Sequence, residues 1–208
     1  MMKNTKNNIL ESALRLFNEA GVAQVSLRTI ATDMEISLGN LTYHFKKREE
    51  IIDALYLQLV EKLDQAIQGE INQSNHLQLL FELPSVCLIS FYEYRFLMLD
   101  FVYINRNHAM IRGHYSKLLE DRAVQFHHIV QELISGQLIR EEIIENEYLY
   151  LFRNLRIVSD FWLSATMIDK DNKLMKKDIA EGAHQLRSMI FPYLTAKGRD
   201  ILGEFSKP

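Results

Sequence analysis

The sequence predicts an all-α protein. Apolar residues recur every three or four positions through almost the whole 208-residue chain, which is the spacing of one face of a helix. Only three prolines and eight glycines interrupt this pattern, and no segment alternates apolar and polar residues for long enough to indicate a strand. The expected fold is therefore helical throughout.

Four helices are predicted in the N-terminal part, over residues 5–20, 27–34, 38–43 and from about residue 46 onward. Gly21 follows the first of them and can adopt the left-handed conformation that stops a helix. Ser26 and Ser37 precede the second and third, where a serine side chain can accept a hydrogen bond from a free backbone N–H. Two short helices joined by a tight turn are thus predicted between two longer ones.

Beyond these helices, the polar stretch "QGEINQSNH" at residues 68–76 predicts a linker. Five further helical patterns cover residues 77–92, 94–104, 110–135, 145–168 and 174–194. Pro84 is expected either to kink the first of these or to begin its second half. The predicted domains are residues 1–50, followed by a connecting helix to about residue 67, and residues 68–208.

The amino-acid composition and the lengths of the apolar runs predict a globular protein. Hydrophobic residues make up 48% and charged residues 25%, as in ordinary globular proteins. The single cysteine, Cys87, excludes an internal disulfide, fits a reducing cytosol and is expected to be a small buried residue. No apolar run reaches the roughly 20 residues of a membrane span, and no signal pattern is present at the start. We expect a cytoplasmic protein that does not insert into a membrane.

Charge is unevenly distributed along the chain. The net charge of −3 argues by itself against a nucleic-acid partner. Residues 1–48, however, carry seven Lys or Arg and four Asp or Glu, a formal charge of +3, which leaves −6 for the remainder. A basic N-terminal part on an acidic body supports a polyanionic partner for the first helices.

The stretch "ISLGNLTYHFKKREE" at residues 36–50 has side chains suited to DNA. Two short helices joined by a tight turn and braced by a third form a helix-turn-helix, whose second short helix enters the major groove. Asn40 and Thr42 offer hydrogen-bonding groups, and a methyl, to base edges. Tyr43 and His44 can bond to phosphate, and the cations of residues 46–48 stand at a helix start, where free N–H groups attract anions. Each residue alone has an ordinary explanation as a turn or surface residue, but together they favour DNA.

The sequence closely resembles the tetracycline-repressor (TetR/AcrR) family of bacterial transcription regulators. The resemblance lies in "NILESALRLFNEAG", "VSLRTIATDMEIS" and "LGNLTYHFKKREEII", in that order and at the family's spacing, over about residues 3–59. It implies an N-terminal three-helix helix-turn-helix domain joined by a long helix to a C-terminal ligand-binding and dimerisation domain. It further implies DNA contacts from Ser26, Arg28, Ser37, Leu38, Gly39, Asn40, Thr42, Tyr43, His44, Lys47 and Arg48.

Three positions depart from the family pattern. Glu35 stands where the turn usually has glycine, so a glutamate must either adopt positive φ, at a cost of roughly 1 kcal/mol, or close the turn differently. Thr42 replaces a tyrosine, which puts the operator preference in doubt. Arg48 replaces a lysine, which keeps the charge but changes the donor geometry.

The middle of the chain contains a candidate effector pocket. Aromatic and methionine residues with a few polar groups are typical of a small-molecule site, although the same stripe also fits an ordinary core. An apolar or amphipathic effector is expected. The candidate lining residues are Tyr94, Met98, Phe101, Phe126 and Trp162, with Arg95, Asp100, Asn105 and His114 as polar groups.

The last two helical patterns are candidates for a dimer interface. The family resemblance implies that they form a four-helix bundle with a second copy, and the alternative is that they only close the core of one chain. The candidate interface residues are Phe152, Leu155, Phe161, Ile179, Ala183, Leu186 and Ile190.

The sequence indicates no enzyme, cofactor or metal. His128 and Glu132 stand four residues apart, but further ligands are lacking and they fit a helix surface better. The expected function is a ligand-responsive regulator, a repressor in most of the family, that binds a palindromic operator as a homodimer and is released by a small molecule. The alternative is a small-molecule-binding helical dimer that has lost sequence-specific DNA reading.

Overall fold

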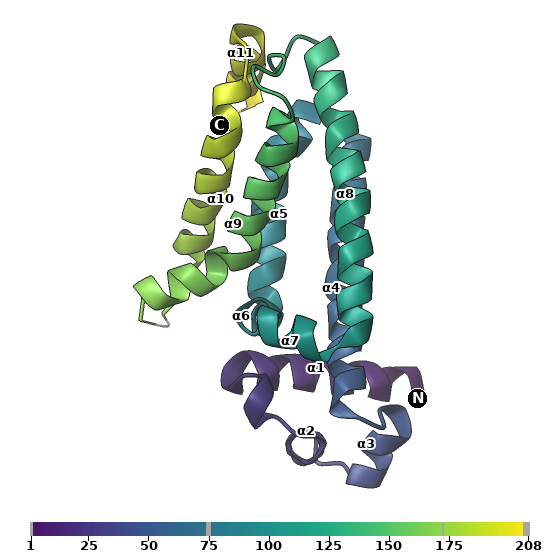
Figure 1. The fold of residues 1–208 in the computed structure, drawn as a ribbon. Coiled ribbons are helices and arrows are strands. Elements are labelled where there is room, and N and C mark those ends of the chain that lie inside the picture. Colours follow the sequence, from purple (N-terminus) through teal and green to yellow (C-terminus); the bar gives the residue numbers. More distant parts are fainter. Residues whose placement is uncertain (1, 74–75, 172, 206–208) are drawn as a thin grey trace. The chain divides into compact units, whose positions relative to one another are not determined.

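The computed structural model describes residues 2–73, 76–171 and 173–205, and within them the chain is helical (Figure 1). Eleven α-helices and two short 3-10 helices form there, with one isolated bridge between Ile139 and Leu194 and no strand among these residues. The predicted fold class is confirmed. The elements are α1 (Met2–Ala20), η1 (Val22–Gln24), α2 (Leu27–Asp33), α3 (Leu38–His44), α4 (Arg48–Gln73), α5 (His76–Glu93), α6 (Arg95–Leu99), α7 (Phe101–Asn107), α8 (Ala109–Ser135), α9 (Glu147–Asp169), α10 (Lys176–Ile190), η2 (Phe191–Tyr193) and α11 (Ala196–Phe205).

The differences from the predicted elements are local. Most of the predicted linker is helix, because α4 continues to Gln73, and its residues 74–75 lie outside the described part. Pro84 lies inside α5 and does not start a helix. The single helix predicted over residues 94–104 is divided at Asp100 into α6 and α7. The final helix, α11, was not predicted.

The chain separates into two compact units. The first reaches Lys62 and includes Phe91–His114, and the second comprises Leu63–Ser90 and the residues from Tyr115 onward. Helices α4, α5 and α8 contribute residues to both. The domain limits at residues 50 and 68 remain a prediction.

In the first unit, α1 packs against α6. The rings of Phe17 and Phe96 stack with 5.0 Å between centroids. Asn18 donates through Nδ2 to the Glu93 carbonyl at 2.7 Å and accepts from the Phe96 N–H at 3.1 Å. The α6–α7 segment, distant in sequence, is thereby fastened to the N-terminal helices.

The same unit joins α4 to the residues around the start of α8. Nδ1 of the buried His108 lies 3.0 Å from Oδ1 of Asp53. One turn further along α4, the Tyr56 hydroxyl lies 3.0 Å from Nδ1 of His114. Asp53 and Tyr56 are three residues apart, so both contacts come from one side of α4.

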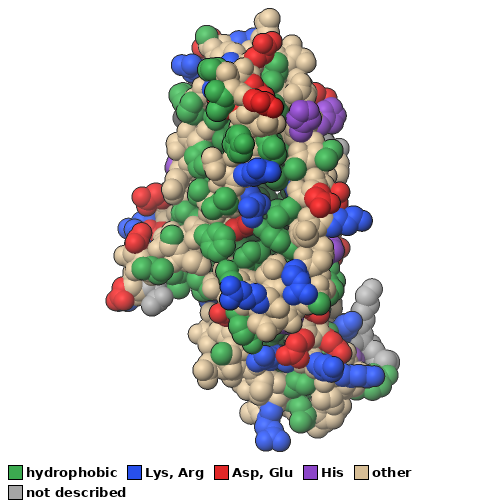
Figure 2. Space-filling view, viewed as in Figure 1, with side chains coloured by type: hydrophobic (Ala, Val, Ile, Leu, Met, Phe, Trp, Pro, Cys, Tyr) green, Lys and Arg blue, Asp and Glu red, His purple; other side chains and the backbone are tan. Residues whose placement is uncertain are grey.

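Helix α9 of the second unit has two apolar faces. One is buried and includes Leu151, Trp162 and Leu163. The other remains at the surface, where apolar side chains gather over α9 in Figure 2. Its exposed members fall at spacings of seven, four and seven residues, which places them on one side of the helix; they are Tyr150, Ile157, Phe161 and Ile168, with exposed fractions of 50%, 47%, 41% and 81%.

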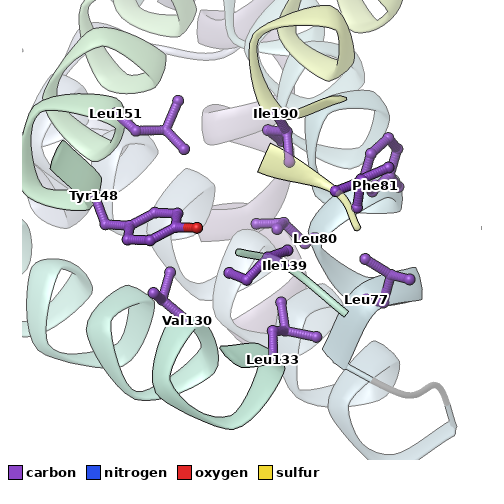
Figure 3. Packing of buried hydrophobic residues seen from close by; sticks show 10 residues of the cluster. Leu77, Leu80, Phe81, Val130, Leu133, Ile139, Tyr148, Leu151 and Ile190 are labelled. Carbon is purple, nitrogen blue, oxygen red and sulfur yellow. The ribbon is translucent and has the colours of Figure 1, made fainter. Parts of the chain in front are cut away.

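The core of the second unit gathers side chains from α5, α8, α9 and α10 (Figure 3). Its buried members are Leu77, Leu80, Phe81, Val130, Leu133, Ile139, Tyr148, Leu151, Ile190 and Leu194. Burying such side chains is worth roughly 1.5–3 kcal/mol each relative to exposure, so this cluster stabilises the second unit. Partial burial also raises the pKa of Cys87 to about 12, helped by the charge of Asp160, which keeps this thiol protonated and unreactive.

The loop between α8 and α9 is held by polar contacts. Arg140 makes two hydrogen bonds to Glu147, at 2.8 and 2.7 Å, and the Ile143 N–H donates to the same carboxylate at 2.9 Å. These bonds, those from Arg140 foremost, lower the pKa of Glu147 to about 2.

After α8, the residue with left-handed backbone is Gln137, with φ of 59°. The glycine before it, Gly136, is not the residue that takes this conformation.

Candidate nucleic-acid interface

Serine caps begin both short helices, as predicted. Ser26 Oγ accepts from the Thr29 N–H at 3.1 Å, and Thr29 Oγ1 accepts from the Ser26 N–H at 3.3 Å, which makes a reciprocal capping box for α2. Ser37 Oγ accepts from the Asn40 N–H at 3.1 Å and caps α3. Both serines are exposed, and each is a structural part of its helix start. Arg28 is also exposed on the first turn of α2.

The turn between α2 and α3 closes with Glu35 at a φ of 55°. The Glu35 N–H donates to the Thr32 carbonyl at 3.1 Å, and the Ile36 N–H reaches back to the Ala31 carbonyl at 3.0 Å. These bonds satisfy carbonyls at the end of α2 in the way that a glycine at this place usually allows. The first of the two possibilities for Glu35 is therefore found, and the turn keeps its positive φ.

Replacing Glu35 with glycine is expected to raise the free energy of unfolding, by up to about 1 kcal/mol, because glycine has no Cβ to clash at positive φ. The same exchange at Glu11, exposed inside α1, is expected to lower it by about 1 kcal/mol. Urea unfolding followed by circular dichroism measures both values. Equal losses of stability for the two variants would contradict the strained turn.

Helix α3 is held down by two apolar side chains and exposes the rest. Leu41 in the helix is fully buried, and Phe45 directly after it is nearly so. Leu38, Gly39, Asn40 and Tyr43 are exposed, Tyr43 by 70%. The exposed residues include hydrogen-bonding groups of the kind that read base edges and phosphates.

The predicted contacts Thr42 and His44 are half-buried. Thr42 Oγ1 donates to the Gly39 carbonyl at 3.2 Å, so its hydroxyl already has a partner inside α3. The His44 ring meets Tyr43 edge-on with 5.3 Å between centroids.

The cations before α4 fall into two groups. Lys46 and Lys47 are exposed. Arg48, by contrast, donates through Nη1 to the Val22 carbonyl at 3.0 Å and to the Val25 carbonyl at 3.4 Å, and is only half-exposed. Its guanidinium therefore joins η1 and the following residue to the start of α4, a positioning role that the residue pattern did not reveal.

The backbone at the start of α4 is less open to anions than the sequence suggested. The helix begins at Arg48, and the Lys46 N–H donates to Glu50 Oε2 at 2.8 Å. Glu49 and Glu50 both lie in the first turn. A phosphate contact here depends on the lysine side chains, and Lys47 is the candidate closest to the helix.

A further contact, not predicted from the sequence, braces α2 against α1. Ser12 Oγ donates to Asp33 Oδ2 at 2.6 Å, and Arg15 pairs with the other oxygen of Asp33. The Ser12 hydrogen bond, followed by that of Arg15, lowers the pKa of Asp33. The bracing fixes α2, and with it α3, on the longer helix.

Two family models match this chain, and together they span almost all of it. The model described as "Bacterial regulatory proteins, tetR family" matches residues 9–55, which contain the helix-turn-helix. The model TetR, described as "Bacterial transcriptional repressor", matches residues 55–202, well over half of the chain. The chain belongs to the TetR family. It is a DNA-binding transcriptional regulator of the helix-turn-helix type.

Individual relatives agree with this assignment. YttP of Bacillus subtilis (strain 168), named as an HTH-type transcriptional regulator, is 30% identical over 92 residues, which are 41% of this chain and 44% of that protein. The chain thus matches less than half the length of this relative. A TetR-family transcriptional regulator from Marinobacter aquaeolei VT8 has a TM-score of 0.82 at 23% identity, covering 98% of this chain and 99% of that one. A transcriptional regulator from Saccharomonospora viridis in complex with choline has a TM-score of 0.73 at 15% identity, covering 92% and 98%. These structural likenesses concern the fold.

The predicted pocket residues are divided between the two units, and their grouping into one pocket stays a prediction. Tyr94, Met98 and Phe101 belong to the first unit, whereas Phe126 and Trp162 belong to the second. Trp162 is 8% exposed and packs on Gly182 of α10, so it is a core residue.

Asp100 and His114, predicted as polar groups of the effector pocket, form hydrogen-bonding contacts within the first unit. Asp100 accepts a hydrogen bond from the Val22 N–H at 3.2 Å, and His114 contacts Tyr56. Phe126 lies beside Phe152, with 5.4 Å between ring centroids.

The predicted dimer residues differ in how far a single chain covers them. Ile179, Ala183, Leu186 and Ile190 of α10 are buried within the chain and contribute to its own core, and their place in a dimer interface stays a prediction. On α9, Leu155 is half-buried and packs against the core cluster, Phe152 is half-buried beside Phe126, and Phe161 is exposed. The exposed residues Tyr150, Ile157 and Ile168 were not among the predicted interface residues, because a helix with two apolar faces does not show from its sequence which face the chain covers.

A buried polar cluster in the second unit was also missed. The Tyr115 hydroxyl donates to Asp160 Oδ2 at 2.5 Å, and Arg156 Nη1 donates to the same oxygen at 3.3 Å. Burial raises the pKa of Asp160, although both hydrogen bonds and the charge of Arg156 lower it. Such a cluster in an apolar surrounding can orient a ligand or specify the packing of α8 on α9.

Neither a metal centre nor a membrane span is found in the described residues. Across these ranges, no three His, Cys, Asp or Glu side chains are grouped so that they could hold a metal ion. Glu132 pairs instead with His76 and lies 3.7 Å from His128. None of the helices described is long and apolar enough to cross a bilayer.

Proposed function

We propose that this TetR-family regulator is a repressor that binds a palindromic operator as a homodimer and leaves it when a small molecule binds the second unit. The observation that carries the proposal is the construction of α3. Its buried Leu41 and Phe45 fix the helix, while Asn40 and Tyr43 point to solvent. A short, rigidly held helix with polar exposed side chains is what the major groove accepts.

The contacts to DNA fall into two classes. Gly39 and Asn40, with Leu38, stand at the exposed start of α3, and this is the end of a recognition helix that meets base edges. Arg28, Tyr43 and Lys47 are exposed on three different helices or their ends and would hold phosphates. Ser26 and Ser37, Thr42, His44 and Arg48 serve first to build the fold, and their contacts to DNA would be additional.

The homodimer would form through the exposed apolar face of α9. With a twofold axis beside this helix, the exposed apolar face of one copy would pack against the same face of the other copy. Each side chain of the face would then be buried once in each copy. A dimer places two copies of α3 on two half-sites, and the resulting operator is a palindrome.

Replacing Ile157 with aspartate is expected to convert the dimer to a monomer, with a dissociation constant raised at least about 100-fold, because a carboxylate would be buried in each copy. Sedimentation equilibrium of the purified protein measures this change. Val124 on α8 is 71% exposed and provides the matched control, since Val124→Asp adds the same charge away from α9. A dimer as strong in Ile157→Asp as in Val124→Asp would place the interface elsewhere.

The effector would bind in the second unit near Tyr115, Arg156 and Asp160. This cluster supplies charged and hydroxyl groups around the buried Asp160, and a few such polar groups fix the orientation of a ligand in a small-molecule site. Helices α4 and α8 continue from this unit into the first, where α4 leads back to α3 and α8 begins next to the His108–Asp53 contact. An effector releases DNA only to the extent that it binds the released arrangement more tightly.

A second candidate function has one observation in its favour. Thr42 replaces the usual tyrosine and donates within α3, and Arg48 is fixed to backbone carbonyls, so two expected DNA contacts are weakened. On this hypothesis the chain is a small-molecule-binding helical dimer without sequence-specific DNA reading.

Selection of duplexes from a random library by the purified protein, at near-physiological salt, separates the two functions. Enrichment of a palindrome with two half-sites about one helical turn apart is expected for the regulator. The folded, dimeric protein would enrich no sequence if the second function were correct.

A further inference from the structure

A groove of about 540 Å³ opens on the second unit, between α5, α10 and α11. Its volume lies within the roughly 300–1,000 Å³ that small-molecule sites occupy. None of its residues belongs to the Tyr115–Asp160 cluster or to the exposed face of α9. It is lined by Gln78, Phe81, Glu82, His184, Arg187, Ser188, Phe191 and Leu202.

The floor and walls of the groove include fixed apolar surface. Phe81 is 7% exposed and belongs to the core cluster, where it lies near Ile190 (Figure 3). Phe191, at the end of α10, is half-exposed and lines the other side, and Leu202 of α11 adds an aliphatic surface. A ligand with an apolar body would bury part of Phe191 that the chain leaves in water.

A preorganised cation stands at the same place. Arg187 donates through Nε to the Phe81 carbonyl at 2.6 Å and through Nη2 to Ser85 Oγ at 2.8 Å. These bonds hold the guanidinium in one orientation, so little side-chain entropy remains to be lost when a ligand binds. The rim carboxylate of Glu82 lies at 3.5 Å and is exposed, which limits how far it neutralises the arginine.

Two further polar side chains lie near the apolar surface of the groove. His184 lines the groove, and the guanidinium carbon of Arg199 lies 5.8 Å from the centroid of the Phe191 ring. Arg199 is itself oriented by bonds from Nε and Nη2 to the Leu194 carbonyl, at 3.3 and 3.1 Å. The groove is thus lined by one oriented arginine and one exposed glutamate, with the imidazole of His184 as a further hydrogen-bonding group and a second arginine on the Phe191 ring. An anion that pairs with Arg187 fits this arrangement.

We propose that the groove binds a small amphipathic carboxylate, with its carboxylate at Arg187 and His184 and its apolar body on Phe81 and Phe191. A planar guanidinium fits a carboxylate better than a simple ammonium does. The site is independent of operator binding and of the effector site proposed above, since it uses other residues.

Isothermal titration of the full-length protein with octanoate tests the proposal, and 1-octanol is the uncharged comparison. Octanoate is expected to bind, and 1-octanol to bind at least about ten-fold more weakly because it cannot pair with Arg187. Ser188→Trp fills the groove and is expected to weaken octanoate binding at least about ten-fold. Ser116→Trp on the exposed surface of α8 is the matched control and is expected to leave the affinity within about two-fold.

Three results would overturn this assignment: no heat of binding with octanoate, equal affinity of Ser188→Trp and Ser116→Trp, or equal affinity for octanoate and 1-octanol. Phe191→Ala serves as a second variant, because it removes the exposed ring and leaves α10 unchanged. It is expected to weaken octanoate binding roughly five-fold through the lost apolar contact. Circular dichroism of each variant verifies its fold before titration.

Discussion

Gly182→Ala is expected to lower the free energy of unfolding of the second unit by about 3 kcal/mol, through overpacking between α9 and α10. A Cβ at residue 182 would lie 2.3 Å from Cε2, 2.5 Å from Cζ2 and 2.7 Å from Nε1 of Trp162. The indole is buried and cannot move aside without displacing its neighbours. Urea unfolding measures the loss. Trp162 is the only tryptophan in the chain, so its fluorescence reports the local change directly.

The control for this prediction is Gly113→Ala in α8, where a new Cβ would meet nothing within 4 Å. Alanine has the higher helix propensity, and this variant is expected to gain about 0.5–1 kcal/mol. The two glycine-to-alanine exchanges are thus expected to change the free energy of unfolding in opposite directions. Of the two glycines, only Gly182 lies in close contact with a side chain of a neighbouring helix. Unchanged stability and unchanged tryptophan emission in Gly182→Ala would show that the two helices are not in such close contact.

The comparison of Gly113 with Gly182 also shows what sequence analysis can and cannot predict. Both look like weak points in a helical pattern, and only the identity of the neighbour across the interface distinguishes them. Local signals were reliable: Ser26 and Ser37 cap the two short helices, as their positions before the helical patterns predicted. These features depend on residues three or four positions apart, whose placement follows from helix geometry.

Contacts between distant segments could not be predicted in this way. Arg48 looked like a phosphate contact because it stands beside two lysines, yet its guanidinium bonds to carbonyls of residues 22 and 25, more than 20 positions away. The apolar spacing of α10 shows that one face of the helix must be covered, but it does not identify the covering surface. In the structure, the core of the same chain covers Ile179, Ala183, Leu186 and Ile190. Periodicity identifies a face that must be buried, and the partner is decided by the whole fold.

The polar stretch at residues 68–76 failed as a linker for a related reason. Polarity is a property of exposed helices as much as of loops, so the residues up to Gln73 extend α4. The helix α11 was missed because its ten residues follow a 3-10 turn and a short connection, where no long pattern develops. Its place is set by contacts such as that of the Lys197 ammonium with the Gly136 carbonyl at 2.8 Å, 61 residues apart in sequence.

Asn40→Ala is expected to weaken binding to the selected operator at least about thirty-fold, while binding to unrelated duplexes changes little. The Asn40 side chain is exposed at the start of α3, and its backbone N–H is already bonded to Ser37, so alanine preserves the helix cap. An amide that reads a base discriminates by about 1–3 kcal/mol, and a homodimer loses this contact in both half-sites. Fluorescence anisotropy with operator and scrambled duplexes, over a range of salt concentrations, measures both affinities.

Lys47→Ala is the comparison for Asn40→Ala, because it tests a phosphate contact that does not depend on the base sequence. Lys47 is exposed beside the start of α4, and in the proposed complex it would neutralise a phosphate whatever the base sequence. Its loss is therefore expected to weaken binding to both duplexes alike and to reduce the salt slope by about two for the proposed dimer. Asn40→Ala should leave that slope unchanged, because no counterion is released by a neutral amide. If Asn40→Ala weakened operator and scrambled DNA equally, α3 would be touching the backbone only, and the specificity of this regulator would have to come from DNA shape or from other residues.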